Sequence, residues 1–328
     1  IGKFCEIPVG PRQYRRLIPI ITDEYPDPNF GSGAVKITGA HDFNDYQVAK
    51  RSNIPMYSLM DKKGIMRVDG SPYKDEAAKA QSILNGEITW DEDLIASMNL
   101  VPDEYRGLDR FEARKKVVAE ITAEGLAVMT DSIDNDGNFS TRPLVESKTI
   151  MQPFGDRSKV VIEPMLTDQW FVETSKIVKP ALDAVKNGEI KIIPASGEKT
   201  YYHWLNNIEP WCISRQLWWG HQVPVWFDKD GNQYCAVTES EAQEQAGSDV
   251  KLTRDPDVLD TWFSSGLWPI GSLGWPEDST ALNQYFPTST LVTGQDILFF
   301  WVARMIMMQL AVRNEIPFDT VYLHGLVR

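Results

Sequence analysis

The first group of side chains that could carry chemistry lies near the start of the sequence. Lys36 follows a Gly-Ser-Gly turn at residues 31–33, and His41 precedes Asp42 and Asp45, three residues apart at the expected start of a helix. Residues at this spacing share one helix face, where a carboxylate can bind an ammonium group or orient a water molecule. Lys36 adds a cation and His41 a candidate proton carrier. Local chemistry alone favours a simpler interpretation, in which the aspartates cap the helix and stay solvated.

A second group is the aromatic stretch at residues 211–220, which reads W-C-I-S-R-Q-L-W-W-G. Its Arg215 lies beside three tryptophans, and an arginine in such surroundings can bind a phosphate or stack on a nucleobase. The alternative is an aromatic-rich edge of the core in which Arg215 donates to backbone carbonyls. The local sequence does not separate these two interpretations.

A third group comprises two strings in the C-terminal part, D-V-L-D-T-W-F-S-S at residues 257–265 and G-Q-D-I at residues 294–297. In the second string a strand is expected to end at Gly294 and a helix to begin with Asp296. Ligands of doubly wound sheets lie at the carboxyl ends of strands, so Asp296 is placed to hold a ribose hydroxyl or an amino group. His324 ends another expected strand in the same way. The commoner uses are an N-cap for Asp296 and a structural role for His324.

The elements that must position these groups indicate an α/β protein. Residues up to about 145 are predicted to be mixed α/β, and the last segment alternates strand, helix and strand, which indicates half of a parallel, doubly wound sheet. The acidic turn at residues 134–138 is predicted to be a hairpin and not a calcium loop, because Pro143 stands in the place of the last glutamate ligand. The expected strands are 34–38, 159–163, 290–293 and 320–324, the expected helices are 42–50, 109–125, 178–187 and 296–313, and further hairpin turns are expected at 61–64 and 228–231.

Length, charge and cysteine content narrow the class of protein. A chain of 328 residues fits two or three domains. The net charge of −13 argues against a general nucleic-acid binder, although it leaves room for a local basic patch. Three cysteines without a C-x-x-C pair predict that the chain has no zinc site and works in a reducing compartment.

One apolar run, at residues 297–312, contains Arg304 and Gln309. It is short for a membrane span and carries a central charge, so we predict a buried helix and no membrane contact. The sequence has no secretory leader, and we expect the protein to be cytoplasmic.

Five strings follow one another in an order that is far more specific than any one of them. They are H-D-x-x-D-Y at 41–46, the stretch from G-D-R-S to D-Q-W-F at 155–171, the aromatic stretch extended to 221, D-V-L-D-T-W-F-S-S-G-L-W at 257–268, and T-G-x-D-I-x-F-F-W-V-A-R-M-I-M-M at 293–308. Together they resemble the valyl-tRNA synthetases of class I, over essentially the whole chain.

The resemblance implies a Rossmann-type catalytic domain interrupted by an editing insertion. Such an enzyme activates valine with ATP and Mg²⁺, transfers it to tRNA(Val), and hydrolyses threonyl-tRNA made in error. Editing is needed because valine and threonine are nearly isosteric, and an apolar pocket rejects an added hydroxyl poorly. The implied division is a β-barrel-like editing domain at 1–145 without its N-terminal part, a connecting region at 146–255, and the second half of the Rossmann sheet at 256–328. The full-length enzyme is expected to be a monomer.

The resemblance also assigns site residues. In the editing pocket Asp45 would hold the amino group of the misattached threonine, with His41 at its flank. In the synthetic site Asp296 would bind an amino or ribose group. The editing residues are Phe30, Lys36, His41, Asp42 and Asp45; the valine pocket is formed by Trp262, Ile297 and Trp301 with Asp296; the ATP site comprises Gly294, Asp296, His324, Gly325 and Leu326.

The sequence also departs from the family pattern. Gly39 stands where the family usually has proline, which predicts a more flexible loop before His41. The H-I-G-H motif is absent, and the K-M-S-K-S loop and the threonine-rich editing strand fall outside the sequence. We therefore expect that this chain alone does not aminoacylate and that its editing pocket is incomplete. We also expect exposed apolar faces in the C-terminal third.

Three other interpretations remain open at this point. An isoleucyl or leucyl synthetase is the nearest, and Ile297 after Asp296 together with the paired Asp42 and Asp45 favours valine instead. A stand-alone deacylase of mischarged tRNA would not need the Rossmann-like C-terminal third. A non-catalytic module derived from a synthetase would not need the retained pocket residues.

Overall fold

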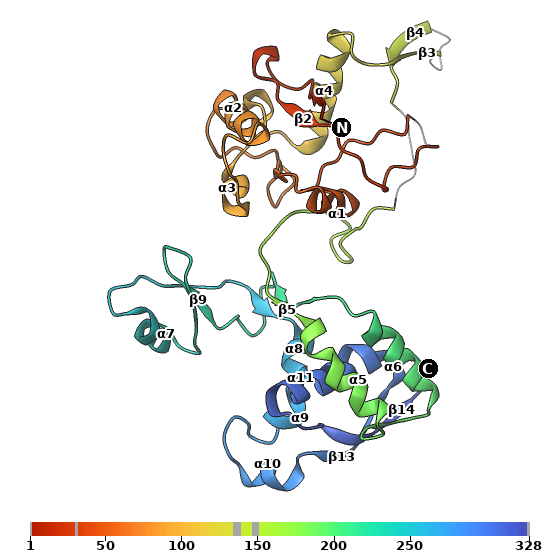
Figure 1. Cartoon of the computed structure of the whole chain (residues 1–328), viewed down its shortest axis with the longest axis vertical. Coiled ribbons are helices and arrows are strands. Elements are labelled where there is room, and N and C mark those ends of the chain that lie inside the picture. Colours follow the sequence, from red (N-terminus) through yellow and green to blue (C-terminus); the bar gives the residue numbers. More distant parts are fainter. Residues whose placement is uncertain (1, 30–31, 134–138, 146–150, 327–328) are drawn as a thin grey trace. The chain divides into compact units, whose positions relative to one another are not determined.

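The structure is a computed structural model that divides into two compact units, Ile1–Thr167 (unit 1) and Asp168–Arg328 (unit 2). Figure 1 shows the elements of both units, which are described separately here. Phe30 and the turn at 134–138 lie outside the described residues, and the division of the chain into three regions stays a prediction. The described residues are 2–29, 32–133, 139–145 and 151–326.

The helices of unit 1 begin and end where local signals place them. Asp42 accepts hydrogen bonds from the backbone N–H groups of Asn44 (2.8 Å) and Asp45 (3.0 Å), so α1 begins directly after it, as predicted. Asp109 caps α4 in the same way, and Gly125, with φ of +73°, ends the turn that follows α4. The helices of unit 1 are α1 (Phe43–Arg51), α2 (Tyr73–Leu84), α3 (Glu92–Ser97) and α4 (Arg110–Ala123), with 3-10 turns η1 (Arg12–Tyr14) and η2 (Asp103–Tyr105).

The strands of unit 1 form separate antiparallel pairs. A closed barrel requires every strand to pair on both edges, and each described strand of unit 1 pairs on one edge only, so the β-barrel-like prediction is not confirmed. The predicted strand at 34–38 is wrong, because no neighbouring strand completes a ladder with that segment. At 159–163 there is only a single bridge, from Val161 to Phe154. The pairs are β1 (Phe4–Glu6) with β2 (Leu17–Pro19) and β3 (Met129–Ile133) with β4 (Phe139–Pro143).

Unit 2 is built on a parallel sheet with the order β13-β14-β6. β13 (Thr288–Gly294) and β14 (Phe318–His324) run side by side, as the sequence predicted, and the chain returns between them through a helical crossover. The third strand, β6 (Lys191–Ile193), pairs with the other edge of β14 and was not predicted. Helices α5 (Val178–Lys186) and α6 (Ser196–Asn206) contribute apolar side chains to the same core as this sheet (Figure 1).

The crossover helix of unit 2 is the apolar run noted in the sequence. It consists of the 3-10 turn η4 (Gln295–Ile297), the π-helix η5 (Leu298–Ala303) and α11 (Arg304–Arg313). The stretch from 295 to 313 is long and apolar enough to cross a membrane by length and composition, and half of that window is buried within the fold. Its buried side chains pack into the core with the parallel sheet, which is the arrangement of a core helix.

The rest of unit 2 consists of short antiparallel ladders and helices. The predicted hairpin at 228–231 is confirmed, because β9 and β10 pair across that turn. These elements are β5 (Phe171–Val172), η3 (Thr174–Lys176), β7 (Trp211–Cys212), β8 (Ser214–Arg215), β9 (Val225–Phe227), β10 (Gln233–Cys235), α7 (Glu239–Ala246), β11 (Thr253–Arg254), β12 (Val258–Leu259), α8 (Thr261–Gly266), α9 (Trp268–Gly271) and α10 (Thr280–Tyr285).

Candidate functional site

In unit 1 the structure brings Lys36, Thr38 and Asp45 together. The Asp45 carboxylate is buried and accepts a hydrogen bond of 2.6 Å from the backbone N–H of Thr38. The Lys36 ammonium donates to the Thr38 hydroxyl at 2.9 Å. Burial raises the pKa of Asp45, although the Thr38 N–H opposes the shift, and burial lowers the pKa of Lys36. The two charged forms are therefore each made less stable by their surroundings, which is typical of groups that exchange protons or bind charged ligands.

Asp42 and His41 have mainly structural contacts in this arrangement. Asp42 is exposed and caps α1, which matches the simpler interpretation of the sequence. The His41 ring bridges two backbone groups: Nε2 accepts from the N–H of Leu59 at 2.9 Å, and Nδ1 lies 3.0 Å from the carbonyl of Pro164. This pattern requires a neutral ring that carries its proton on Nδ1. Burial lowers the pKa of His41, which also favours the neutral ring.

A cavity of about 730 Å³ opens beside Lys36 and Thr38. Its wall is largely apolar and includes Ile18, Val35 and Trp90, together with the cation Arg16. A cavity of this size with a few polar groups is typical of a small-molecule or nucleotide site. Asp45 does not line the cavity itself; its carboxylate holds the 36–38 segment that does.

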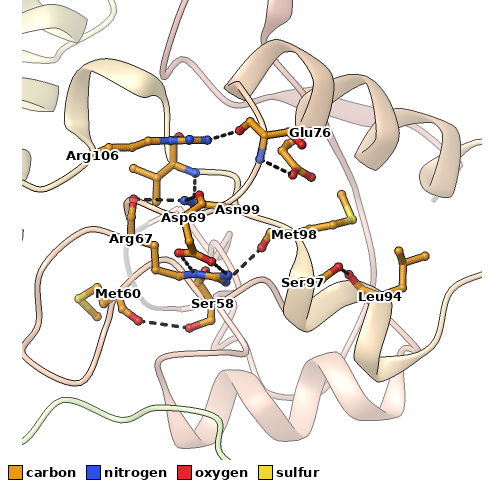
Figure 2. Close-up of polar contacts among 12 residues, drawn as sticks. Ser58, Met60, Arg67, Asp69, Glu76, Leu94, Ser97, Met98, Asn99 and Arg106 are labelled. Atoms are coloured by element: carbon orange, nitrogen blue, oxygen red, sulfur yellow. Dashed lines mark hydrogen bonds and ion pairs between the residues drawn. The ribbon is translucent and has the colours of Figure 1, made fainter. Parts of the chain in front are cut away.

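A polar network stabilises the elements around this cavity. Figure 2 shows Asn99 and Arg67 at its centre. The fully buried Asn99 amide donates to the carbonyls of Arg67 (3.1 Å) and Asp69 (2.7 Å) and accepts from the N–H of Val101 (3.0 Å). Arg67 in turn donates to the carbonyls of Ser58 and Met98, both at 3.1 Å. The network therefore connects Ser58, which lies between the cavity-lining residues 57 and 59, to the loop that follows α3.

In unit 2 the predicted residues meet at the carboxyl edge of the parallel sheet. Gly294 and His324 are register partners at the ends of β13 and β14. A Cβ atom on Gly294 would lie 2.4 Å from Asp296 Oδ1 and 3.8 Å from His324 Cε1, so these three residues are immediate neighbours. Asp296 and His324 are exposed, as a ligand at this edge requires. Gly325 and Leu326 follow His324 directly and are exposed too.

Aromatic side chains of α8 and η5 pack together in the same unit. Trp262 stacks on Phe300 with ring centroids 5.9 Å apart, and Trp301 meets Trp268 at 5.7 Å. The Trp301 indole N–H donates to the carbonyl of Ser265 at 3.0 Å, which fixes its ring against α8. The π-helix therefore holds Trp301 one turn beyond the exposed Asp296, and π-helical turns are frequent at functional sites. Ile297 is half-buried between these two positions in the sequence.

Asp260 links the aromatic stretch to this region, and no role was predicted for it from the sequence. Its Oδ2 accepts from the Trp211 indole at 2.9 Å and forms ion pairs with Arg215 (3.2 Å) and Arg304 (3.5 Å). Its Oδ1 caps α8 through the N–H of Trp262. Arg215 also donates to two backbone carbonyls, so the structural interpretation of the aromatic stretch describes its contacts. The D-x-x-D spacing within the 257–268 string was the only local signal for Asp260.

The described residues lack the ligand cluster of a metal site, and unit 2 contains a second hollow. Within residues 2–29, 32–133, 139–145 and 151–326, no group of three or more His, Cys, Asp or Glu side chains could hold a metal ion. A second hollow of about 580 Å³ lies among β10, α7 and their neighbours in unit 2, and it shares no residue with either candidate site. It has no group of facing charges that would indicate chemistry, because its only charged lining residues are Glu241 and Glu244.

A parallel sheet with a polar carboxyl edge and an adjacent aromatic wall is an α/β arrangement that is typical of nucleotide-binding proteins. The family model of tRNA synthetases class I (I, L, M and V) matches residues 42–328, and the chain belongs to this family. Within it, the chain is similar to the valine–tRNA ligase of Ruegeria pomeroyi, with 61% identity over 382 aligned residues that cover all of this chain and 37% of the ligase. The valine–tRNA ligase of Zymomonas mobilis is 50% identical over all of this chain and 32% of its own length.

The chain thus spans about a third of the length of these relatives. Among solved structures, methionyl-tRNA synthetase of Mycobacterium tuberculosis bound to methionyl-adenylate aligns with a TM-score of 0.39 and 17% identity, over 88% of this chain and 48% of that one. This likeness is too low to support an argument about the site.

Proposed function

We propose that this chain is part of a protein that ligates valine to tRNA(Val) with ATP and hydrolyses threonyl-tRNA(Val) formed in error, and that the chain alone does not aminoacylate. The ligase part is supported by the whole-chain similarity to valine–tRNA ligases. The observation that carries it in the fold is the exposed Gly294–Asp296–His324 edge of the parallel sheet, next to the packed tryptophans of α8 and η5. We assign deacylation to unit 1, where Lys36 lines the cavity and Asp45 holds the cavity-lining Thr38 through its backbone N–H.

In the proposed ligase reaction, ATP enters with Mg²⁺ as a substrate. The carboxylate of valine attacks the α-phosphorus and pyrophosphate leaves, which forms a mixed anhydride. A ribose hydroxyl of the tRNA then attacks the carbonyl, and AMP leaves. Gly294 allows the nucleotide to approach the backbone, with His324, Gly325 and Leu326 beside the base and Asp296 at the ribose or the amino group. Trp262, Ile297 and Trp301 form an apolar wall for the valine side chain.

In the proposed editing reaction, a water molecule attacks the ester carbonyl and the ribose oxygen leaves. Asp45 holds the threonine amino group, because a buried carboxylate favours a cationic partner over solvent. Lys36 provides a positive charge near the oxygen that becomes negative in the transition state. His41 does not act as the base, because both of its ring nitrogens contact backbone groups.

The editing proposal is tested with threonyl-tRNA(Val) that has been prepared separately, so that hydrolysis does not depend on ligation. We expect the chain to release threonine at a reduced rate, because its editing pocket is predicted to be incomplete, and Asp45→Ala to lower that rate by about 100-fold, as expected when a charged contact to the substrate is lost. Asp42→Asn is the matched control, because Asp42 is exposed and its capping contacts survive in part. The Ruegeria pomeroyi ligase serves as the positive control for the substrate. Equal rates for the native chain and Asp45→Ala would refute the role of Asp45.

The ligase proposal is tested by binding, with non-hydrolysable valyl-, isoleucyl- and leucyl-adenylate analogues. We expect the valyl analogue to bind most tightly, as the whole-chain similarity to valine–tRNA ligases implies. Tighter binding of either larger analogue would support the isoleucyl or leucyl alternative. Loss of tryptophan fluorescence on binding would report on Trp262 and Trp301.

We further propose that the protein works in the cytoplasm as a monomer, with tRNA(Val), valine and ATP as its partners.

A further inference from the structure

Arg16 differs from the other half-buried arginines of unit 1 in having no acidic partner among the described residues. It lines the 730 Å³ cavity, and its guanidinium lies over the Tyr57 ring at 5.5 Å from the centroid. Among the described residues no carboxylate forms an ion pair with it. Its neighbour Arg15, by contrast, pairs with Glu124 at 2.6 Å and with Glu6 at 3.4 Å. Arg16 is half-buried, and this burial lowers the pKa of its guanidinium.

A second cation faces the same cavity. Lys36 lines it, and Arg16 adds to the effect of burial in lowering the pKa of Lys36. The carboxylate that lines the cavity in the described part of unit 1, Asp23, is already paired with Arg51 at 2.8 Å. Asp45 lies behind Lys36 and bonds to Thr38. The cavity therefore has an excess of positive charge in a largely apolar wall.

An excess of positive charge in a cavity with a partly apolar wall favours the binding of an anion beside the half-buried Arg16 and the exposed Lys36. Arginine presents a planar fork that matches the oxygens of a phosphate, and its stacking on Tyr57 orders the fork before the ligand arrives. A cavity of this volume accommodates a nucleoside with one phosphate group. The apolar wall suits a base or sugar, and the cations suit the group attached to it.

We propose that Arg16, together with Lys36, binds the phosphodiester on the 5′ side of the terminal nucleoside of an RNA 3′ end. The proposal rests on the editing function and extends it, because it gives unit 1 a contact to the RNA backbone in addition to the aminoacyl group. Arg16 is a substrate-positioning residue in this scheme and takes no part in proton transfer. A backbone contact of this kind sets the position of the terminal ester without reading base identity.

The first test measures binding of three probes to the 328-residue chain: the dinucleotide cytidylyl-(3′→5′)-adenosine, adenosine and inorganic phosphate. We expect the dinucleotide to bind about 10-fold more tightly than adenosine, which is the usual effect of one charge-assisted contact. In Arg16→Met the two should bind equally, with adenosine unchanged, and Arg16→Lys should recover part of the difference. Arg114→Met is the matched control, because Arg114 is exposed on α4 and contacts only the Phe111 ring in the described residues.

The outcomes separate the proposal from its alternatives. Competition of inorganic phosphate with the dinucleotide, but not with adenosine, would support a phosphate subsite. Binding of phosphate without any preference for the dinucleotide would indicate a general anion site and overturn the RNA assignment. A parallel loss of adenosine and dinucleotide binding in Arg16→Met would indicate that Arg16 only maintains the cavity. A dinucleotide preference that persists in Arg16→Met would also overturn the proposal.

A second test separates this inference from the editing function itself. The hydrolysis of 3′-threonyl-adenosine, which lacks a phosphate, is compared with that of the 3′-threonyl ester of the dinucleotide. We expect Arg16→Met to slow only the second substrate, by about 10-fold in kcat/KM. If the native chain hydrolyses neither ester, the editing function fails, while the binding test still decides the phosphate subsite. If Arg16→Met slows both esters equally, the phosphate contact is refuted.

Discussion

The two units position their candidate residues by different means. In unit 2 the register of a parallel sheet brings the ends of β13 and β14 together, so Gly294 and His324 become neighbours through backbone pairing alone. In unit 1 no sheet connects the candidate residues. There Asp45 holds Thr38, and the His41 ring links Leu59 to Pro164, through single hydrogen bonds from side chains to backbone. Unit 1 therefore depends on a few side chains for a geometry that unit 2 derives largely from its main chain.

This difference predicts where each unit is sensitive to substitution. A sheet edge tolerates changes at most side chains, because its geometry comes from a ladder of many backbone hydrogen bonds. A site built on loops loses its shape when one buried polar side chain is removed, because the backbone groups that it satisfied are left without partners. The exception in unit 2 is Asp260, whose role resembles that of the side chains in unit 1.

The largest effect is expected from Asp260→Ala, which tests that exception. Asp260 forms ion pairs with Arg304 and Arg215, and Arg304 is almost fully buried. Burial lowers the pKa of Arg304 to about 10 even with Asp260 beside it, and an arginine side chain stays protonated at neutral pH. Leaving a buried charge unpaired costs about 3 to 5 kcal/mol. Urea unfolding of unit 2, followed by tryptophan fluorescence, measures the loss.

Asp183→Ala is the matched control for this substitution. Asp183 forms an ion pair with Lys179 on the exposed face of α5, and such pairs contribute less than about 1 kcal/mol. Asp260→Asn should lie between the two, because an amide oxygen can still accept from the Trp211 indole. If Asp260→Ala were no more harmful than Asp183→Ala, the sheet alone would be sufficient to organise unit 2.

The next largest effect is expected in unit 1, from Asn99→Ala. The substitution leaves the carbonyls of Arg67 and Asp69 and the buried Val101 N–H without this partner, and we expect a loss of about 2 to 3 kcal/mol in the stability of unit 1. Asn44→Ala is the control, because the Asn44 side chain is exposed on α1 and should change stability by less than about 0.5 kcal/mol. Equal effects of the two substitutions would contradict the dependence of unit 1 on buried polar side chains.

The same difference explains what the sequence could predict. Helix α1 begins after Asp42 and α4 after Asp109, as expected, because a cap is a contact within a few residues. The strand–helix–strand order of β13, α11 and β14 was also predicted, because its hydrophobic pattern is local. The strand at 34–38 was wrong because strand formation requires a partner, which no local pattern supplies.

The candidate sites show the same contrast between features with a local sequence pattern and features that depend on distant contacts. The neighbours at the sheet edge, Gly294, Asp296 and His324, were predicted together, because strand ends in a parallel sheet share one edge. Arg16 was missed, because a doubled arginine before an apolar segment has no distinctive local pattern. Its lack of an acidic partner is visible only when the ion pairs of unit 1 are compared. Roles such as that of Asp45 in editing stay predictions until the deacylation assay is made.

A smaller effect is expected from Gly294→Ala, which tests how the edge of unit 2 depends on close approach. Gly294 has φ of −68°, so an alanine is compatible with the backbone, and its Cβ would meet only the end of the Asp296 side chain at 2.4 Å. We expect a change in stability below about 1 kcal/mol, because a flexible carboxylate can move. Binding of the valyl-adenylate analogue should fall about 10-fold, since Asp296 is displaced from its position.

Gly271→Ala is the control for this substitution, because a Cβ at Gly271 has open space around it and the residue is not part of the proposed site. Calorimetric titration of both variants with the same analogue gives the comparison. Unchanged binding to Gly294→Ala would mean that neither the glycine nor the placement of Asp296 contributes to ligand recognition at this edge.

The smallest effect is expected from the titration of His41, which tests the loop geometry of unit 1 without a large change in packing. Burial lowers the pKa of His41 below its ordinary value of 6.5, although the Pro164 carbonyl and Glu163 oppose the shift. The unfolded chain therefore takes up a proton before the folded chain does as the pH falls. The contribution of His41 to the free energy of unfolding is complete above pH 6.5. It is lost as the pH falls from there towards the folded-state pKa, with a slope of at most about 1.4 kcal/mol per pH unit.

In His41→Gln this slope should disappear, because glutamine does not titrate. The difference between the two stability profiles cancels the contribution of every other titrating group. Parallel profiles would mean that the ring accepts a proton without losing the Leu59 contact, which is incompatible with Nε2 as a hydrogen-bond acceptor.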